Sequence, residues 1–146
     1  MAGTLRLGGV YLSAGREEEL EKKVVVRVIL VVEDEALVRL VAEMTLRGQG
    51  YKTLSAGDVD EALTILQTPQ RIDALFTDIY LKTAPLGGCS LARQALTLRP
   101  DLRVLYTTGN LATEQMKALF VPSAHFLPKP YSDDQLRDSM HGLLAA

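Results

Sequence analysis

The sequence is poor in the residues that mark cross-linked, membrane-spanning or nucleic-acid-binding chains. It holds one cysteine, Cys89, so no internal disulfide can form and a secreted disulfide scaffold is excluded. The longest apolar run is Val28 to Val32, far short of the ~20 residues that a helix needs to cross a bilayer. The formal net charge of −2 leaves no general basic footprint for nucleic acid. We therefore expect a cytoplasmic protein that contacts neither membrane nor nucleic acid directly.

Several cofactor motifs are missing as well. No cluster of histidine and cysteine suggests zinc. No GxxxxGK[ST] motif indicates a nucleotide-binding P-loop, and no GxGxxG motif indicates a dinucleotide site. The Ser/Thr/Gly-rich loop that the phosphate of FMN needs after the first strand is also lacking, which counts against a small FMN carrier.

What remains is the composition of an ordinary globular domain. The 146 residues leave room for one domain, because domains usually span about 100–200 residues. Hydrophobic residues make up 47% of the chain and charged residues 23%, which is typical of a soluble protein with its own core. A chain of this size needs no disulfide or metal in order to fold.

From residue 24 onward, short apolar segments alternate with amphipathic ones. Residues 24–32 are largely β-branched and nearly all apolar, which predicts a strand buried on both faces, as in parallel sheets. Four further short strands are predicted at residues 51–55, 72–77, 102–107 and 125–127. Five βα units in a row predict an α/β fold, a doubly wound five-stranded parallel sheet with helices on both faces.

Helices are predicted between the strands and at the end of the sequence. In the first helix, which should end near Gly48, four apolar residues recur at helical spacing: Leu37, Leu40, Val41 and Met44. Asp58, with Glu61 three residues later, resembles a capping box at the start of the second helix. Ser90 and Ser132 are expected to cap the third and the last helix. Residues 113–120 are predicted to form a short helix.

Charged and hydroxyl-bearing residues follow four of the predicted strands. They are Glu33, Asp34 and Glu35 after the first, Asp78 after the third, Thr108 after the fourth and Lys129 after the fifth. In open parallel sheets the functional site lies at the carboxyl ends of the strands, so we expect these side chains to converge. Clustered carboxylates repel one another unless a cation joins them, and an all-oxygen ligand set favours Mg²⁺. A carboxylate beside Mg²⁺ can attack phosphorus and form an aspartyl phosphate, whose oxygens a lysine and a hydroxyl would neutralise.

Four motifs in this order resemble the receiver domain of two-component response regulators. They are residues 29–35 (ILVVEDE), 75–78 (LFTD), 104–109 (VLYTTG) and 126–130 (FLPKP), each at a strand end. The resemblance covers about residues 26–145 and implies a flavodoxin-like, CheY-like fold. It also implies phosphoryl transfer from a sensor histidine kinase or a histidine phosphotransfer protein to an aspartate.

The resemblance implies a role for each residue of the metal and phosphoryl site. It implies that Asp78 is the phosphoacceptor and that Asp34 binds Mg²⁺ directly. Glu33, the neighbouring acid, would act on the metal through water, and the backbone carbonyl of Tyr80 would be the third protein ligand beside Asp34 and Asp78. Lys129 would pair with the phosphoryl group.

The resemblance further implies a conformational switch. Phosphorylation of Asp78 would draw the switch hydroxyl of Thr108 inward, and the switch aromatic Phe126 would follow. The face made by the fourth helix, the fifth strand and the fifth helix would change, and an unknown output protein would bind it. The family also implies a cis peptide bond between Lys129 and Pro130, which turns the lysine into the site.

The loop after Asp78 departs from the usual pattern of the family. Family members commonly carry a proline four residues after the acceptor and a glycine four residues later, where this sequence has Lys82 and Leu86. The prolines and glycines of this loop come later, which predicts a slightly longer loop beside the metal.

The identity of Tyr80 leads to a prediction about the lifetime of the phosphorylated protein. The family implies that the side chains at Tyr80 and Asn110 flank the path of the water that hydrolyses an aspartyl phosphate. A large aromatic there predicts slower autodephosphorylation than in a Tyr80→Asn variant. The alternative is that the Tyr80 side chain turns outward and only covers the loop.

We expect a stand-alone response-regulator receiver over residues 24–146 and a mobile N-terminal extension over residues 1–23. In the extension, Ser13 offers a cap for a short, marginal helix through residues 17–23. The protein is not expected to be an enzyme beyond Mg²⁺-dependent self-phosphorylation and autodephosphorylation. The alternatives are a phosphate sink or relay without an output partner, and a pseudo-receiver that serves as a constitutive interaction module. The complete acceptor, metal, hydroxyl and lysine set argues against the pseudo-receiver.

Overall fold

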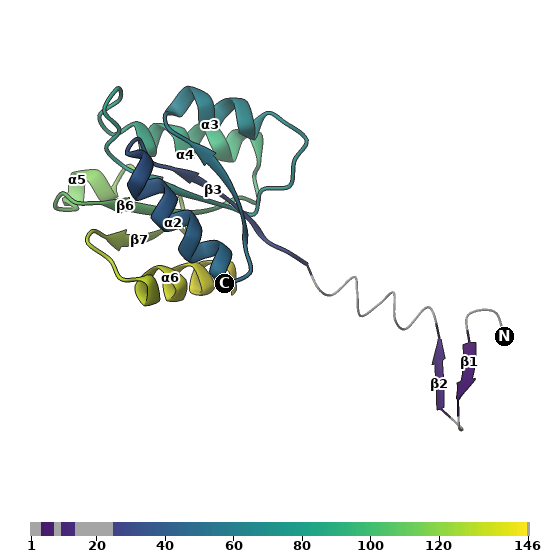
Figure 1. Cartoon of the computed structure of the whole chain (residues 1–146). Coiled ribbons are helices and arrows are strands. Elements are labelled where there is room, and N and C mark those ends of the chain that lie inside the picture. Colours follow the sequence, from purple (N-terminus) through teal and green to yellow (C-terminus); the bar gives the residue numbers. More distant parts are fainter. Residues whose placement is uncertain (1–3, 8–9, 14–24, 146) are drawn as a thin grey trace.

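Five short parallel strands form the centre of the computed structural model, which describes residues 4–7, 10–13 and 25–145 (Figure 1). The strands are β3 (Val28–Val32), β4 (Lys52–Ala56), β5 (Ala74–Asp78), β6 (Arg103–Thr108) and β7 (His125–Pro128). They lie in the order β4-β3-β5-β6-β7, so the direction of winding reverses between β3 and β5. The predicted doubly wound α/β fold is confirmed, and its switch point lies at the carboxyl ends of these two strands.

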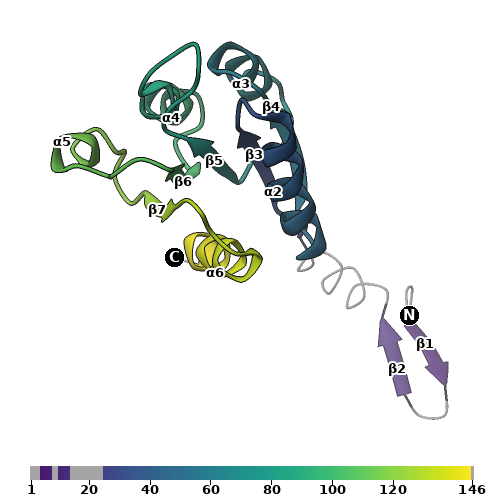
Figure 2. The same ribbon diagram turned by 60° about the vertical axis from the view of Figure 1, so that its left-hand side comes forward.

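Helices cover both faces of the sheet (Figure 2). They are α2 (Ala36–Gly48), α3 (Val59–Leu66), α4 (Gly87–Leu98), α5 (Glu114–Lys117) and α6 (Asp133–Ala145). One apolar core lies under α2 and α6, and the other lies under α3, α4 and α5. Along β6, Leu105 enters the first core and Tyr106 the second, because successive residues of a strand face opposite sides of a sheet.

The first strand is shorter than its apolar run predicts. Strand β3 begins at Val28, whereas Val25 and Val26 are exposed, and Val24 lies outside the described residues. The pairing with β4 starts at Val28 and the pairing with β5 one residue later. A β-branched run needs a neighbouring strand to form a ladder, and residues 25–27 precede both neighbours.

Helix α2 lies where the periodicity predicts it, but its apolar stripe does not face the core. Leu37, Leu40, Val41 and Met44 are all exposed, and the buried side chains are Ala42, Glu43 and Leu46. Burial of the Glu43 carboxylate is possible because the Ser55 hydroxyl of β4 donates a hydrogen bond to it. We call the exposed set Leu37, Leu40, Val41 and Met44 the α2 stripe.

The N-terminus of α4 also differs from the prediction. The helix begins at Gly87 with Leu86 as its N-cap residue, so Ser90 lies inside the helix and is not its cap. Leu86 has a left-handed φ of 57°. A Cβ atom on Gly88 would lie 2.1 Å from the carbonyl oxygen of Asp78, which only glycine avoids. The pair of glycines therefore lets α4 start directly against the end of β5.

The other predicted caps are confirmed. The Asp58 carboxylate accepts a hydrogen bond from the Glu61 N–H, and the Ser132 hydroxyl accepts one from the Gln135 N–H. The Glu61 carboxylate in turn accepts a hydrogen bond from the Gly57 N–H, one residue earlier than a capping box requires.

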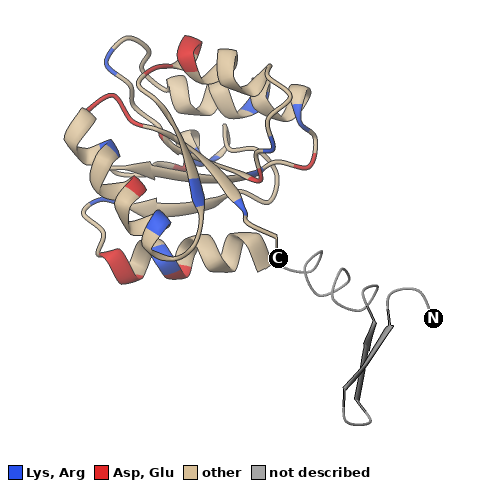
Figure 3. Ribbon diagram, turned by 45° about the vertical axis from the view of Figure 1, so that its right-hand side comes forward, with Lys and Arg blue, Asp and Glu red and all other residues tan. Residues whose placement is uncertain are grey.

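Two N-terminal strands, β1 (Thr4–Leu7) and β2 (Val10–Ser13), form a separate antiparallel pair. These two strands were not predicted from the sequence, and the helix predicted over residues 17–23 lies outside the described residues. In the part of the chain that the structure covers, no helix has the length and apolarity to cross a bilayer. Basic and acidic residues are interspersed along the strands and helices rather than gathered by sign (Figure 3).

Candidate functional site

The predicted site residues converge at the carboxyl edge of the sheet. A cleft of about 470 Å³ is lined by Glu33, Asp34, Asp78, Tyr80, Thr108 and Lys129. Glu33 and Asp34 directly follow β3, Asp78 and Thr108 end β5 and β6, and Lys129 directly follows β7. Phe126 is the one predicted residue that does not line this cleft.

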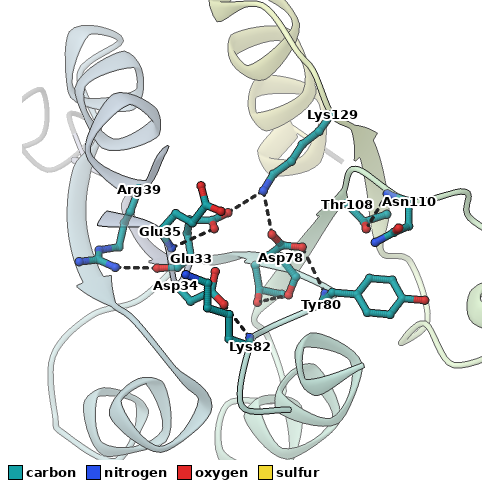
Figure 4. Close-up of polar contacts among 11 residues, drawn as sticks. Glu33, Asp34, Glu35, Arg39, Asp78, Tyr80, Lys82, Thr108, Asn110 and Lys129 are labelled. Atoms are coloured by element: carbon teal, nitrogen blue, oxygen red, sulfur yellow. Dashed lines mark hydrogen bonds and ion pairs between the residues drawn. The ribbon is translucent and has the colours of Figure 1, made fainter. Parts of the chain in front are cut away.

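Lys129 connects the acids of two strands (Figure 4). Its ammonium group donates hydrogen bonds to Glu33 Oε2 and to Asp78 Oδ2, each at 2.7 Å. The peptide bond from Lys129 to Pro130 is cis, as the family resemblance implies. The Lys129 N–H donates to the carbonyl oxygen of Thr108 at 3.0 Å, which fixes the lysine beside the end of β6.

Burial governs the electrostatics of this group. Asp78 is only 7% exposed and Glu33 only 5%. Burial raises the pKa of Glu33, and the hydrogen bond from Lys129 offsets part of that rise. Burial also acts against the charge of Lys129, but the hydrogen bonds to Asp78 and Glu33 outweigh it and raise the pKa of the lysine. The ammonium therefore stays charged and faces the Asp78 carboxylate at neutral pH.

The loop between β5 and α4 contacts two of the cleft carboxylates, those of Asp34 and Asp78. It spans residues 79–86 and folds into a turn in which Leu81 pairs with Ala84. The Lys82 N–H donates to Asp34 Oδ2 at 2.6 Å, and the Tyr80 N–H donates to Asp78 Oδ1 at 3.2 Å (Figure 4). Sequence reasoning missed the contact with Lys82, because it depends on the path of the loop and not on the identity of the side chain.

The donor set of the cleft has the chemistry of a magnesium site. The carboxylates of Glu33, Asp34 and Asp78 line one cleft, and the Lys129 ammonium pairs with two of them, Glu33 and Asp78. Carboxylate and carbonyl oxygens are the ligands that hard divalent cations prefer. Among the described residues, no three His, Cys, Asp or Glu side chains are grouped so that they could hold a metal ion by themselves. Hydrogen bonds to Lys129 and to the Lys82 N–H hold these carboxylates in the structure.

The two predicted switch residues lie on the neighbouring strands β6 and β7, two positions apart in the register. Thr108 is buried, and its hydroxyl accepts a hydrogen bond from the Asn110 N–H at 3.1 Å. Phe126 pairs with Tyr106 in the ladder and is half-buried. The Phe126 ring lies 6.0 Å from the Phe120 ring, which stacks on Tyr106 at 4.3 Å. Three aromatic rings thus form a contiguous row behind the end of β6.

An acidic pair on one strand end, an aspartate on the central strand, and a hydroxyl and a lysine on the next two define the receiver class of flavodoxin-like proteins. The sequence model of the response regulator receiver domain family matches residues 29–141, and the chain belongs to this family. The chain is 32% identical over 117 residues to the response regulator MprA of Mycobacterium avium (strain 104). That match covers 80% of this chain and 50% of the relative, so the chain spans about half the length of the curated relatives it matches.

Solved structures agree with this family. The response regulator receiver protein of Sinorhizobium medicae WSM419 is 30% identical, with a TM-score of 0.76, and the match covers 83% of this chain and 96% of that one. A CheY-like receiver domain protein of Methanospirillum hungatei JF-1 is 20% identical, with a TM-score of 0.74 over 83% of this chain and 95% of that one. The second likeness concerns the fold alone.

Proposed function

We propose that Asp78 of this receiver accepts a phosphoryl group from a histidine kinase or a histidine phosphotransfer protein. The observation that carries the proposal is the Lys129 ammonium, which lies 2.7 Å from the buried Asp78 carboxylate at the switch point of the sheet. The chain would act on no other substrate, and its chemistry would be confined to gaining and losing this group.

Each residue of the cleft would have its own role in the transfer. An Asp78 carboxylate oxygen forms the bond to phosphorus while the bond from phosphorus to the donor histidine nitrogen breaks. Mg²⁺, held by Asp34, Asp78 and the Tyr80 carbonyl, would supply positive charge against the phosphoryl oxygens. Lys129, already next to Asp78, exchanges a carboxylate partner for a phosphoryl oxygen. The Thr108 hydroxyl provides a further hydrogen bond to the transferred group.

The switch follows from the position of Thr108. Its hydroxyl now accepts a hydrogen bond from the Asn110 N–H, so turning it toward a phosphoryl group on Asp78 breaks a contact of the loop after β6. Phe126 lies behind this strand in the row of aromatic rings. A shift of Thr108 therefore changes the face made by α5, β7 and α6, and the output protein would bind that face.

The α2 stripe offers a docking surface for the phosphodonor. Leu37 and Val41 line a hollow of about 550 Å³ together with Lys129, Pro130 and Tyr131. The cleft lined by Asp34, Asp78 and Lys129 is, under this proposal, the phosphoryl-transfer cleft. The hollow adjoins it, because Gly109 and Lys129 line both. A donor whose histidine must reach Asp78 covers this rim, and exposed apolar side chains there gain from being covered.

The proposal is tested with a small phosphodonor. Incubation of the full chain with acetyl phosphate and Mg²⁺ is expected to add one phosphoryl group, measured by intact mass. The Asp78→Asn variant should stay unmodified, and a chelator should abolish the modification of the wild type. A phosphoryl group that appears on Asp78→Asn at the wild-type level would refute Asp78 as the acceptor.

A further inference from the structure

Thr107 carries a buried hydroxyl without a protein partner. It is 3% exposed, and its Oγ1 is the one buried side-chain oxygen or nitrogen in the described part of the chain that lacks a hydrogen bond. Buried hydroxyls are nearly always hydrogen-bonded, because an unpaired one loses its interactions with water and gains nothing in return. The neighbouring Thr77 follows the rule, since its hydroxyl donates to the carbonyl oxygen of Asp78 at 2.9 Å.

Thr107 lies on the same face of the sheet as the two site acids. Asp78 is paired with Thr107 in the ladder between β5 and β6. Phe76 and Val31, each two residues before Asp78 and Glu33, are paired with each other and belong to the core under α2 and α6. Because alternate residues of a strand share a face, Glu33, Asp78 and Thr107 stand in one row across three strands.

A small cavity lies below this row. Its volume is about 10 Å³, and it is lined by the three polar residues together with apolar ones: Val31, Val32, Val38, Ala42, Phe76 and Tyr131. One water molecule needs roughly 10–15 Å³ and two to four polar partners. Tyr131 and Val38 also line the outer hollow beside the α2 stripe, so the two spaces share part of their lining. Tyr131 packs edge-on against Phe76, with 6.0 Å between ring centroids.

We propose that this cavity is a binding site for one structural water molecule, which bridges the Thr107 hydroxyl to the buried side of the Asp78 and Glu33 carboxylates. The Thr107 hydroxyl donates a hydrogen bond to the water. The water in turn donates to the two carboxylates on the side that borders the apolar core, opposite the cleft. Thr107 is thereby a positioning residue, which acts on Asp78 through the water. That second statement rests on the proposed function of Asp78, whereas the water site does not.

Two measurements test the water site without any phosphorylation. A high-resolution crystal structure of the full chain is expected to contain a water within hydrogen-bonding distance of Thr107 Oγ1, and density showing a dry cavity would overturn the site. Thr107→Val removes the hydroxyl and keeps the shape. Its Tm is expected to fall, as should that of the matched Thr77→Val, because both lose a satisfied hydroxyl. A rise in the Tm of Thr107→Val, the result for a truly unpaired hydroxyl, would also overturn the site.

The positioning role is tested by the rate of phosphorylation. With acetyl phosphate and saturating Mg²⁺, Thr107→Val is expected to react about fivefold more slowly, the factor that one net hydrogen bond supplies. Thr107→Ser keeps the hydroxyl and should react at the wild-type rate. Equal rates for Thr107→Val and the wild type would refute the positioning role. If the wild type itself is not phosphorylated, the proposed function fails, and the crystal structure and melting curves still decide the water site.

Discussion

Tyr80 is the bulkiest side chain on the rim of the phosphoryl-transfer cleft. It lines this cleft together with Asn110 and Thr108, and it is 37% exposed (Figure 4). The ring is therefore neither buried nor turned fully away from the cleft. A water that attacks a phosphoryl group on Asp78 has to pass this rim.

Replacing Tyr80 by asparagine should shorten the lifetime of the phosphorylated protein. We expect autodephosphorylation of Tyr80→Asn to be about tenfold faster, which corresponds to ~1.4 kcal/mol in the barrier, because the ring no longer shields the acyl phosphate. Tyr80→Phe keeps the ring and serves as the control, with a lifetime close to that of the wild type. The loss of phosphoryl-protein is followed by intact mass after removal of the donor. Equal lifetimes for Tyr80→Asn and Tyr80→Phe would contradict the shielding role.

At the scale of single residues, the sequence predicts the polar members of the site well and their partners poorly. Asp34, Asp78, Thr108 and Lys129 were found because parallel strands bring their carboxyl ends to one edge. The contact of Asp34 with the Lys82 N–H was not predicted, because it uses a backbone N–H, which every residue except proline would supply at position 82. The orphan hydroxyl of Thr107 was not predicted, because burial without a partner is visible only in the packed structure.

Arg99 links two helices, because it follows α4 directly and contacts the end of α3. Its guanidinium donates to the carbonyl oxygens of Leu66, Thr68 and Gln70 at 3.0, 2.6 and 2.6 Å. These carbonyls lie at and beyond the C-terminus of α3, where backbone acceptors lack intrahelical partners and a positive charge is favourable.

Removing this guanidinium should destabilise the domain. We expect Arg99→Ala to lower the free energy of unfolding by about 1.5–3 kcal/mol, the range for hydrogen bonds from a charged donor. Arg99→Lys should recover only a small part, because an ammonium cannot span three carbonyls as the planar guanidinium does. The exposed Arg93 on the same helix gives the control, Arg93→Ala. Urea unfolding measures all three variants, and an Arg99→Ala curve that overlays the Arg93→Ala curve would contradict the assigned role.

Asp73 ties together the starts of three strands. Its carboxylate accepts a hydrogen bond from the Val28 N–H at 2.8 Å, and its carbonyl accepts one from the Arg103 N–H at 3.2 Å. Burial acts to raise the pKa of this carboxyl, but the hydrogen bonds from Arg71 and Val28 outweigh burial and lower the pKa below its usual 3.8. The ionised form is therefore the one that the folded state prefers.

The lowered pKa of Asp73 predicts a pH-dependent contribution to stability. The contribution is fully present above the pKa that Asp73 has in the unfolded chain. It is lost as the pH falls through the lower pKa that Asp73 has in the folded protein. At pH 7, Asp73→Asn should reduce the free energy of unfolding by about 1–3 kcal/mol, and this difference should shrink as the pH falls below 3.8. Urea unfolding of both proteins at a series of pH values measures it, with Asp101→Asn, an exposed position, as the control. A difference that stays constant down to the acid end would contradict the assignment.

Periodicity predicted which elements form but not which side of α2 is buried. The α2 stripe has the spacing of a core-facing stripe, and the structure buries Ala42, Glu43 and Leu46 in its place. A polar Glu43 can face the sheet because Ser55 of β4 pairs with it, and that long-range contact leaves no mark on the local pattern. The pair of β1 and β2 was missed for another reason, since each strand spans only four residues and so short a pattern predicts no strand by itself.

Two outer surfaces of the molecule flank the site, one on the α2 side and the other on the face of α5, β7 and α6. The α2 stripe and the hollow beside Tyr131 lie on the α2 side, where Lys129 and Gly109 are shared with the phosphoryl-transfer cleft. The face of α5, β7 and α6 lies behind Thr108 and the row of aromatic rings. We infer that the donor approaches over the first surface and that the output protein reads the second, so the two partners need not compete for the same residues.

Substitutions in the α2 stripe should impair docking of the donor protein and leave the chemistry at Asp78 intact. Leu37 is 77% exposed and Val41 is 58% exposed, so aspartate at these positions should leave the fold intact. We expect Leu37→Asp with Val41→Asp to slow phosphoryl transfer from a histidine-phosphorylated donor protein by at least about tenfold, or ~1.4 kcal/mol, because two covered apolar side chains are lost. Phosphorylation by acetyl phosphate should be unchanged, because a small donor needs no apolar contact.

The matched control is Leu98→Asp on α4, a similarly apolar and exposed position away from the cleft. It should transfer from the protein donor at the wild-type rate. If the α2 variant loses transfer from both donors, the substitutions have damaged the site itself and the surface plays no separate part. If it keeps transfer from both, the donor docks elsewhere. Only a selective loss with the protein donor assigns the α2 stripe to docking. That pattern is expected because Leu37 and Val41 line the hollow and not the cleft that holds Asp78.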